Sequence, residues 1–214
     1  MSHRQSVLVP NGQGGVGYAV RAPSRAPPKL VGFAGPAGSG KDTVAQAFKR
    51  RAEEAGYAVD VYHYATALKE GCRSMFGLTD RQLYGDLKEV KDAFHGVTPR
   101  EILQGVGTDL FRKRLGGALP GLSYAAEDFW VHAVRKRYEE SSADFFLTPD
   151  VRFPNEVANT TACGGRVYML QRHGSGTAFA HESEELAFDP SQMVRLENNG
   201  TVAAAAEAIW SDLV

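Results

Sequence analysis

The chain has 214 residues, of which 43% are hydrophobic and 23% are charged, and its formal net charge is −1. This size suits one α/β domain with a substantial core, while the near-neutral charge argues against nucleic acid as a partner and no apolar run is long enough to span a membrane. With two cysteines far apart in sequence, we expect neither disulfides nor a zinc site, and a cytoplasmic location.

Residues 1–28 contain glycine, proline and arginine without hydrophobic periodicity. We interpret this stretch as a flexible N-terminal tail. The remaining residues, 29–214, are predicted to form one domain.

A phosphate-binding loop is the strongest motif. Residues 30–34 read as a buried strand, and Val44, Phe48 and Ala52 have the spacing of a helix that follows. The sequence between them, GPAGSGK, matches G-x-x-x-x-G-K, in which backbone N–H groups and the lysine bind phosphates. The predicted ATP-binding residues are Gly35, Ala37, Gly38, Ser39, Gly40, Lys41, Asp42 and Thr43. The general motif has Ser or Thr as its Mg²⁺ ligand where this chain has Asp42, so that ligand is left unassigned.

The next predicted elements are a strand at 58–62 and a helix containing Leu68, Cys72, Met75 and Phe76. Lys69 lies in the first turn of this helix, where a cation is unfavourable unless an anion is near. A solvated lysine is an equally simple interpretation. Residues 79–82 have the pattern of a capping box, and residues 85–96 read as an exposed connection.

Thr98, Pro99 and Glu101 predict a helix start, with Ile102, Leu103, Val106, Leu110 and Phe111 on its buried face. Gly105 and Gly107 each cost this helix about 1 kcal/mol relative to alanine, which indicates a close backbone approach, a ligand or tight packing. Arg100 opposes the helix dipole, and an anion held between it and the helix N-terminus would resolve that conflict. Arg112 and Arg114 are expected to be solvated.

A helix is predicted at 125–140, followed by an apolar strand at 143–147. Asp150 comes just after that strand, at the position of the Walker B acid, where α/β sheets bind ligands. The polar run DVRFPNE at 150–156 therefore predicts a functional site.

Strands at 166–170 and 193–196 and a helix capped by Thr201 complete the pattern. Residues 171–189 have no apolar period, and we interpret them as a lid with Arg172 at its base. Five strands alternating with helices predict an α/β fold with a five-stranded parallel sheet flanked by helices.

The segments GPAGSGKDT, YATALKEGCRSMFG, TPREILQGVGTDLFR, DVRFPNE and HESEE resemble the bacteriophage-type deoxynucleoside monophosphate kinases, from about Lys29 to the C-terminus. The resemblance implies a P-loop kinase fold, with ATP and Mg²⁺ as co-substrates. It also implies γ-phosphoryl transfer to the 5′-phosphate of a deoxynucleoside monophosphate, giving the diphosphate for dNTP synthesis. Asp42 agrees with that family's pattern. A phage-encoded member would act in the host cytoplasm.

Phosphoryl transfer needs positioned groups and charge neutralisation, which suggests a role for each candidate. Lys41 and the loop amides would bind ATP, and Asp150 would hold Mg²⁺ or face the acceptor's phosphate. Arg172 could move onto the transferring group, which completes the catalytic set of Lys41, Asp150, Arg152 and Arg172. The predicted substrate-binding residues are Lys69, Arg100, Asp150 and Arg152 for the phosphate, with Thr108, Asp109, Trp130 and Asn155 for the sugar or base.

Two alternatives stay open. Similar DVRF-x-NE segments occur in animal phosphomevalonate kinases, so another small phosphorylated acceptor would fit the same residues. The chain could also bind nucleotide without transferring phosphate. In all three cases the expected partners are small molecules, and neither nucleic acid nor a membrane is expected. The apolar stripes of the helices fit a single core, and the sequence does not decide whether the chain forms a homodimer.

Overall fold

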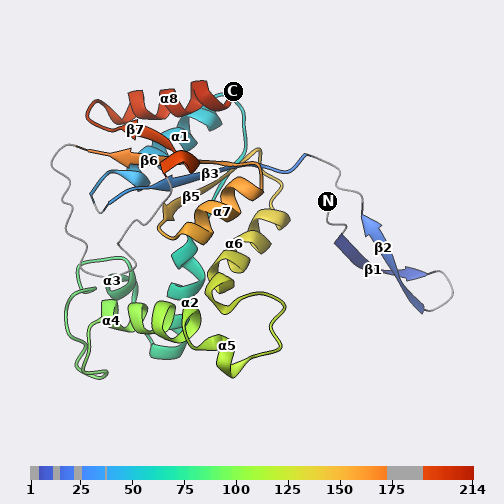
Figure 1. Ribbon diagram of the computed structural model, residues 1–214, viewed down its shortest axis with the longest axis vertical. Coiled ribbons are helices and arrows are strands. Elements are labelled where there is room, and N and C mark those ends of the chain that lie inside the picture. The colour runs from blue at the N-terminus through green and yellow to red at the C-terminus, as the bar shows by residue number, and fades with distance from the viewer. Residues whose placement is uncertain (1–4, 12–14, 22–25, 37, 173–189) are drawn as a thin grey trace.

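A five-stranded parallel sheet forms the centre of the molecule (Figure 1). The computed structural model describes residues 5–11, 15–21, 26–36, 38–172 and 190–214. The strand order is β4-β5-β3-β6-β7, so β3 pairs with strands that follow it much later in the chain. All five predicted strands are confirmed: β3 Lys29–Ala34, β4 Val59–Val61, β5 Phe145–Val151, β6 Arg166–Gln171 and β7 Val194–Glu197.

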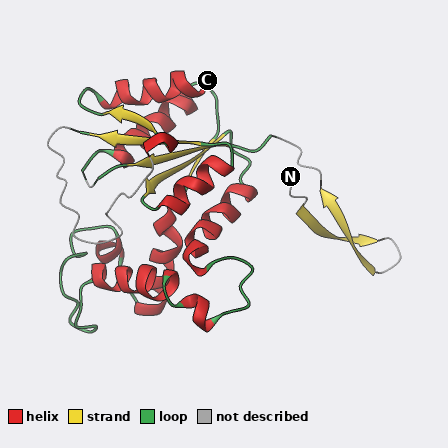
Figure 2. Ribbon diagram, in the orientation of Figure 1, coloured by secondary structure: helices red, strands yellow, loops and turns green. Residues whose placement is uncertain are grey.

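Helices cover both faces of this sheet, as predicted (Figure 2). On one face, α1 (Lys41–Glu54) and α8 (Val202–Leu213) pack in a cluster with Val31 and Phe33 of β3. On the other face, α6 (Phe129–Glu140) and α7 (Pro154–Ala162) share a cluster with Leu30 and Ala34 of β3. Successive residues of a strand point to opposite faces, so a strand covered on both sides is apolar throughout.

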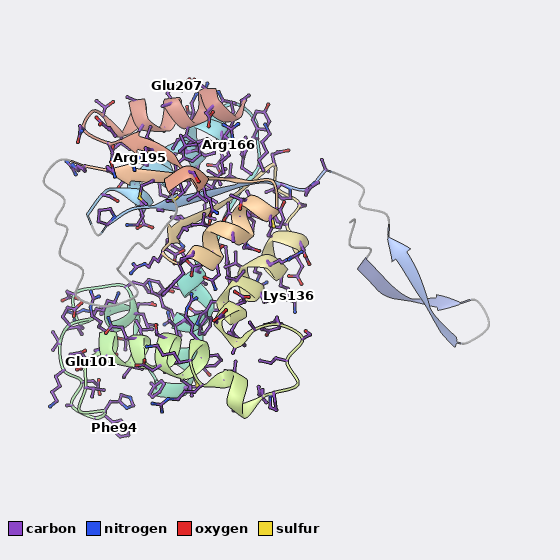
Figure 3. The ribbon with its side chains drawn as sticks, viewed as in Figure 1. Phe94, Glu101, Lys136, Arg166, Arg195 and Glu207 are labelled. Atoms are coloured by element: carbon purple, nitrogen blue, oxygen red, sulfur yellow. The ribbon has the colours of Figure 1, made fainter. Side chains whose placement is uncertain are left out.

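A helical subregion lies beyond the α6 and α7 layer. Its core contains Cys72, Leu83, Ile102 and Leu103. Figure 3 shows Glu101 of this subregion at the end of the molecule opposite Glu207 of α8. The helical elements outside the two layers are α2 Tyr64–Phe76, α3 Asp80–Leu83, α4 Pro99–Gln104, the π-helix η1 Gly105–Arg112, α5 Leu115–Ala118, and the 3₁₀ turns η2 Ala126–Asp128 and η4 Pro190–Gln192.

The start of α4 has the predicted cap. The Thr98 hydroxyl accepts from the Glu101 N–H at 3.1 Å, and the Glu101 carboxylate accepts from the Thr98 N–H at 2.7 Å. The chain then continues as the π-helix η1 where one regular helix was expected. The side chains consequently depart from a 3.6-residue period, and Leu110 is 48% exposed, so its predicted burial is wrong.

Gly107 in η1 is closely packed. A Cβ atom there would lie 2.7 Å from Cδ2 of Leu68, and the Gly107 carbonyl accepts a hydrogen bond from Trp130 Nε1 at 2.9 Å. The structure therefore shows close packing against α2 and α6 at this glycine, which is one of the explanations that the sequence left open. Met75, one of the apolar residues of the helix predicted here, lies at the end of α2 and is exposed.

The N-terminal segment contains regular structure that the sequence analysis did not predict. Strands β1 (Gln5–Asn11) and β2 (Gly15–Arg21) form an antiparallel hairpin in which Val9 pairs with Gly17. The alternation of Val16, Tyr18 and Val20 with smaller or polar residues is the strand signal that was overlooked. That residues 1–28 are flexible, and separate from a domain at 29–214, stays a prediction. Within the described ranges, no helix is both long and apolar enough to cross a bilayer.

Candidate active site

The predicted phosphate-binding loop joins the end of β3 to the start of α1. Gly35, Gly38 and Gly40 have φ values of 138°, 77° and 90°, which L side chains rarely adopt. At Gly35 a Cβ atom would also lie 2.4 Å from the Leu170 carbonyl oxygen. Lys41 Nζ donates to the carbonyls of Gly35 at 2.7 Å and Pro36 at 2.8 Å. The loop therefore has the tight turn and the lysine that its motif predicted, while Ala37 lies outside the described residues.

Asn198, at the end of β7, anchors this loop from the other end of the chain. Its side-chain amide donates to the Ser39 carbonyl at 2.9 Å, and its own N–H donates to the Gln171 carbonyl at 2.7 Å. Ser39 is fully buried, and its hydroxyl has no hydrogen-bond partner among the described atoms. The sequence analysis missed this contact, whose local signal is a polar residue directly after a strand.

Replacing Asn198 with alanine is expected to loosen the loop without unfolding the protein. The change removes a buried hydrogen bond and leaves the Ser39 carbonyl unsatisfied, a cost of about 1–3 kcal/mol. Calorimetric titration with an ATP analogue should show affinity reduced roughly tenfold. The exposed neighbour Asn199 is the matched control, and equal affinities for Asn198→Ala and Asn199→Ala would contradict the anchoring role.

Asp42 pairs with His63, the residue that precedes α2. The Asp42 Oδ1 atom lies 3.0 Å from His63 Nε2. The hydrogen bond from His63 lowers the pKa of Asp42, and the hydrogen bond to Asp42 raises the pKa of His63. This pair thus joins the N-terminal ends of α1 and α2.

The stability that His63 contributes should depend on pH. A raised folded pKa makes this contribution complete below the unfolded value of 6.5, and it is lost as the pH rises through the folded pKa. Asp42 acts in the opposite sense, with its contribution present above 3.8 and lost as the pH falls through its lowered pKa. Because the side chains are 39% and 73% exposed, we expect only about 0.5 kcal/mol from the pair.

Denaturant unfolding of wild type and His63→Gln should therefore differ more at about pH 5.5 than at about pH 8.5. The Asp42→Asn background is the control, because removing the partner should abolish the pH-dependent part. A difference in unfolding free energy that is the same at both pH values would contradict the pairing.

Asp150 lies within β5, since that strand continues to Val151 and does not end at residue 147 as predicted. Its two carboxylate oxygens accept from the N–H groups of Tyr64 at 2.7 Å and Ala65 at 3.0 Å. The carboxylate therefore caps α2. Each oxygen keeps a further lone pair, and magnesium in kinase sites is held by one or two carboxylates together with substrate phosphates. Asp150 fits that donor set, although no group of three candidate metal ligands occurs among the described residues.

A cavity of about 470 Å³ lies between α2, α4, η1 and the start of α7. Asp42 is among its lining residues, so it opens beside the phosphate-binding loop. The structure brings six of the predicted substrate residues together on its walls, namely Lys69, Arg100, Thr108, Trp130, Asp150 and Arg152. Of these six, Lys69 and Arg100 come from α2 and α4, and Arg152 follows β5. The prediction that these distant segments meet is therefore supported by their placement.

Outside the phosphate-binding loop, three predicted site residues do not line this cavity. Asp109 is an exposed residue of η1 whose carboxylate lies 3.4 Å from Lys113 Nζ. Asn155 donates to the Asp128 carboxylate at 2.8 Å. Arg172 is exposed, at the edge of residues 173–189, and most of the predicted lid lies outside the described residues. Asp109 and Asn155 are therefore not part of the cavity wall, because the wider turns of η1 and the start of α7 direct these side chains elsewhere. Their contact with the sugar or base stays a prediction.

A buried ion pair that the sequence analysis missed supports the backbone at Arg152. Glu156 is 1% exposed, and its Oε1 accepts from the guanidinium of Arg112 at 2.7 Å. Its Oε2 accepts from the N–H groups of Arg152 at 2.7 Å and Phe153 at 3.2 Å. Burial raises the pKa of Glu156 to about 7, and Arg112 and these N–H groups oppose that rise. Arg112 is therefore an internal support and not the solvated residue that was expected.

The charge of Arg152 affects a lysine of the phosphate-binding loop, Lys41, and a lysine of the cavity, Lys69. Burial lowers the pKa of Lys41, and repulsion from Arg152 lowers it further. The pKa of Lys69 is also lowered, first by burial and in part by Arg152. The same guanidinium group therefore lowers the pKa of a lysine in the phosphate-binding loop and of a lysine in the cavity.

Comparison with known proteins assigns the family. A protein of Acanthamoeba polyphaga mimivirus named "Putative deoxynucleotide monophosphate kinase" is 33% identical over 198 residues, which cover 86% of this chain and 94% of that protein. The chain belongs to this deoxynucleotide monophosphate kinase family. No protein-family model matches it.

As a member of this family, the chain is a P-loop kinase by fold, as its loop and sheet order indicate. Two solved structures are weakly similar to it. An APS kinase CysC mutant of Mycobacterium tuberculosis is 16% identical with a TM-score of 0.45, covering 87% of this chain and 97% of its own. The same kinase in complex with AMPPNP and APS is 14% identical with a TM-score of 0.45, covering 87% and 98%. These values are too low to bear on function.

Proposed function

We propose that the protein transfers the γ-phosphoryl group of ATP to the 5′-phosphate of a deoxynucleoside monophosphate. The observation that supports this most is the position of Arg152, which lines the cavity together with Lys69, Lys88 and Asp42 of the loop. Its charge lowers the pKa values of Lys41, Lys69 and Lys88. Two anionic groups brought together in a kinase need a cation between them. The relative's name supports the nucleotide acceptor.

In this proposal the loop binds the donor. The loop amides and Lys41 Nζ hold the outer phosphates of ATP, so Lys41 exchanges its bonds to the Gly35 and Pro36 carbonyls for bonds to phosphate oxygens. Mg²⁺, when bound, neutralises charge on the β- and γ-phosphates. Asp150 is the residue that would hold it, directly or through water, while it caps α2.

The cavity binds the acceptor in this proposal. Its volume of about 470 Å³ is within the range of small-molecule sites. Arg100 and Arg152 bind the acceptor's phosphate, because arginine matches phosphate oxygens with paired N–H groups. Thr108 and Trp130 contact the sugar or base, and the indole contributes its ring because its N–H is bonded to Gly107.

The chemical step needs no protein base. An oxygen of the acceptor phosphate attacks the γ-phosphorus, the bond to the β–γ bridging oxygen breaks, and ADP leaves. The attacking oxygen is already anionic, so no proton has to be removed. Arg152 reduces the repulsion between the two phosphates as they approach.

The test is ADP formation with a panel of acceptors: deoxy- and ribonucleoside monophosphates, and phosphomevalonate. ADP formed only with deoxynucleoside monophosphates is the expected result. If ADP forms only with phosphomevalonate, the acceptor is phosphomevalonate and the proposed nucleotide acceptor is contradicted. If ATP binds but no acceptor-dependent ADP forms, the protein is better explained as a nucleotide-binding module. Lys41→Ala in the same assay controls for contaminating kinases.

A further inference from the structure

Lys88 lies in the connection between α3 and α4, shown in green in Figure 1. Sequence analysis expected residues 85–96 to be an exposed connection. Lys88 is instead half-buried and lines the cavity. Its carbonyl accepts from the Arg100 N–H at 3.1 Å, which places it against the first turn of α4. The backbone therefore holds Lys88 beside Arg100 at the same wall.

Lys88 shares this wall with three other cations. After burial, repulsion from Arg100, Lys69 and Arg152 lowers the pKa of Lys88, with a smaller opposing effect from Glu89. Arg100 is paired with Glu89, and Lys69 Nζ lies 4.0 Å from the centre of the Tyr84 ring. Lys88 forms no ion pair or side-chain hydrogen bond with any residue that the structure describes. The free protein thus keeps a half-buried charge in an unfavourable position, which is typical of a binding site.

We propose that Lys88 binds the phosphomonoester group of the acceptor, together with Arg100 and Arg152. This inference rests on the proposed function and adds a phosphate-binding residue to it. A phosphate dianion would compensate the charges that repel one another in the free protein. A mobile ammonium on the α3–α4 connection can bind phosphate oxygens that the two planar guanidinium groups leave exposed. Lys88 is then a substrate-binding residue and does not touch ATP.

Lys88→Gln tests the proposal, with Lys91→Gln as its matched control. Lys91 is an exposed lysine of the same connection that does not line the cavity. The ligands are inorganic phosphate, dTMP and dGMP, and an ATP analogue, each measured by calorimetry and by the shift in Tm. Lys88→Arg keeps the charge and should restore most of the phosphate affinity.

Binding of phosphate and of the accepted monophosphate should weaken roughly 10- to 100-fold in Lys88→Gln, the effect of one charge-assisted contact. Affinity for the ATP analogue should stay the same. The Tm of the unliganded variant should equal or exceed that of wild type, because a repelled charge has been removed. A structural lysine would instead lower the Tm.

Unchanged phosphate affinity, an equal loss of affinity for the ATP analogue, or no phosphate binding by wild type would each overturn the proposal. The proposed function fails separately. If phosphate binding depends on Lys88 but no acceptor-dependent ADP forms, the phosphate site at Lys88 is supported and the proposed kinase function is contradicted. If Lys88→Gln forms ADP with the same acceptor KM as wild type, the kinase function is supported and only the role of Lys88 in binding the acceptor is contradicted.

Discussion

Lys41→Ala is expected to reduce kcat by roughly 10²- to 10³-fold or more, while the protein remains folded. The ammonium is the one side-chain cation of the phosphate-binding motif, and it would neutralise charge that develops on the transferring phosphate. Among the residues that the structure describes, the ammonium donates hydrogen bonds to the carbonyls of Gly35 and Pro36. Removing a partly buried cation from such contacts should change the Tm by only a few degrees.

Acceptor-dependent ADP formation measures this effect, and circular dichroism melting checks the fold. Lys49→Ala is the matched control, because Lys49 lies on the same helix and pairs with the exposed Glu53. Its kcat should equal that of wild type. A Lys41→Ala variant that keeps more than about a tenth of wild-type kcat would mean that this loop does not carry out the transfer.

Arg152→Ala should lower kcat/KM for the acceptor by roughly 10²- to 10⁴-fold and change ATP affinity far less. The side chain is exposed at the cavity, while its backbone N–H is bonded to Glu156. The substitution therefore leaves the buried support intact, and the Tm should not change. Arg152→Lys keeps the charge but loses the paired N–H geometry, so it should restore activity only in part.

Steady-state kinetics with each substrate varied in turn will separate the two effects. Arg137→Ala, on the exposed surface of α6, controls for the loss of a positive charge. If the KM for ATP and the KM for the acceptor rise equally in Arg152→Ala, Arg152 does not lie between the two phosphates. If the kinetic constants of Arg152→Ala equal those of wild type, Arg152 does not take part in binding or catalysis.

The elements of this fold could be predicted because their signals are local. The glycines around Lys41 and the cap at Thr98 depend on the backbone of neighbouring residues, and both were predicted correctly. The five strands were found from short apolar runs. The hairpin at 5–21 had a local signal as well, and it was overlooked among the glycines and prolines.

The fine placement of side chains could not be predicted where the backbone departs from a regular period. Leu110 belongs to the π-helix η1, so counting in turns of 3.6 residues assigned it to the buried face, whereas it is exposed. Asp150 was expected beyond the strand, and it caps α2 from inside β5. The sequence identified Asp150 as a candidate site residue, but it could not predict the hydrogen bonds to the N–H groups of Tyr64 and Ala65.

The sequence by itself determined that a phosphate-binding loop follows a buried strand and that cations occur in later segments. Which of those cations face the loop was decided only by the tertiary structure. Asn198 reaches Ser39 across 159 positions, and Glu156 reaches Arg112 across 44. Such contacts form because the parallel sheet brings the segments after β7 and β5 close to residues far away in the sequence, and the low-dielectric interior favours a partner for each buried polar group. A linear pattern records which groups need partners, whereas the packing of strands and helices decides which partner each one meets.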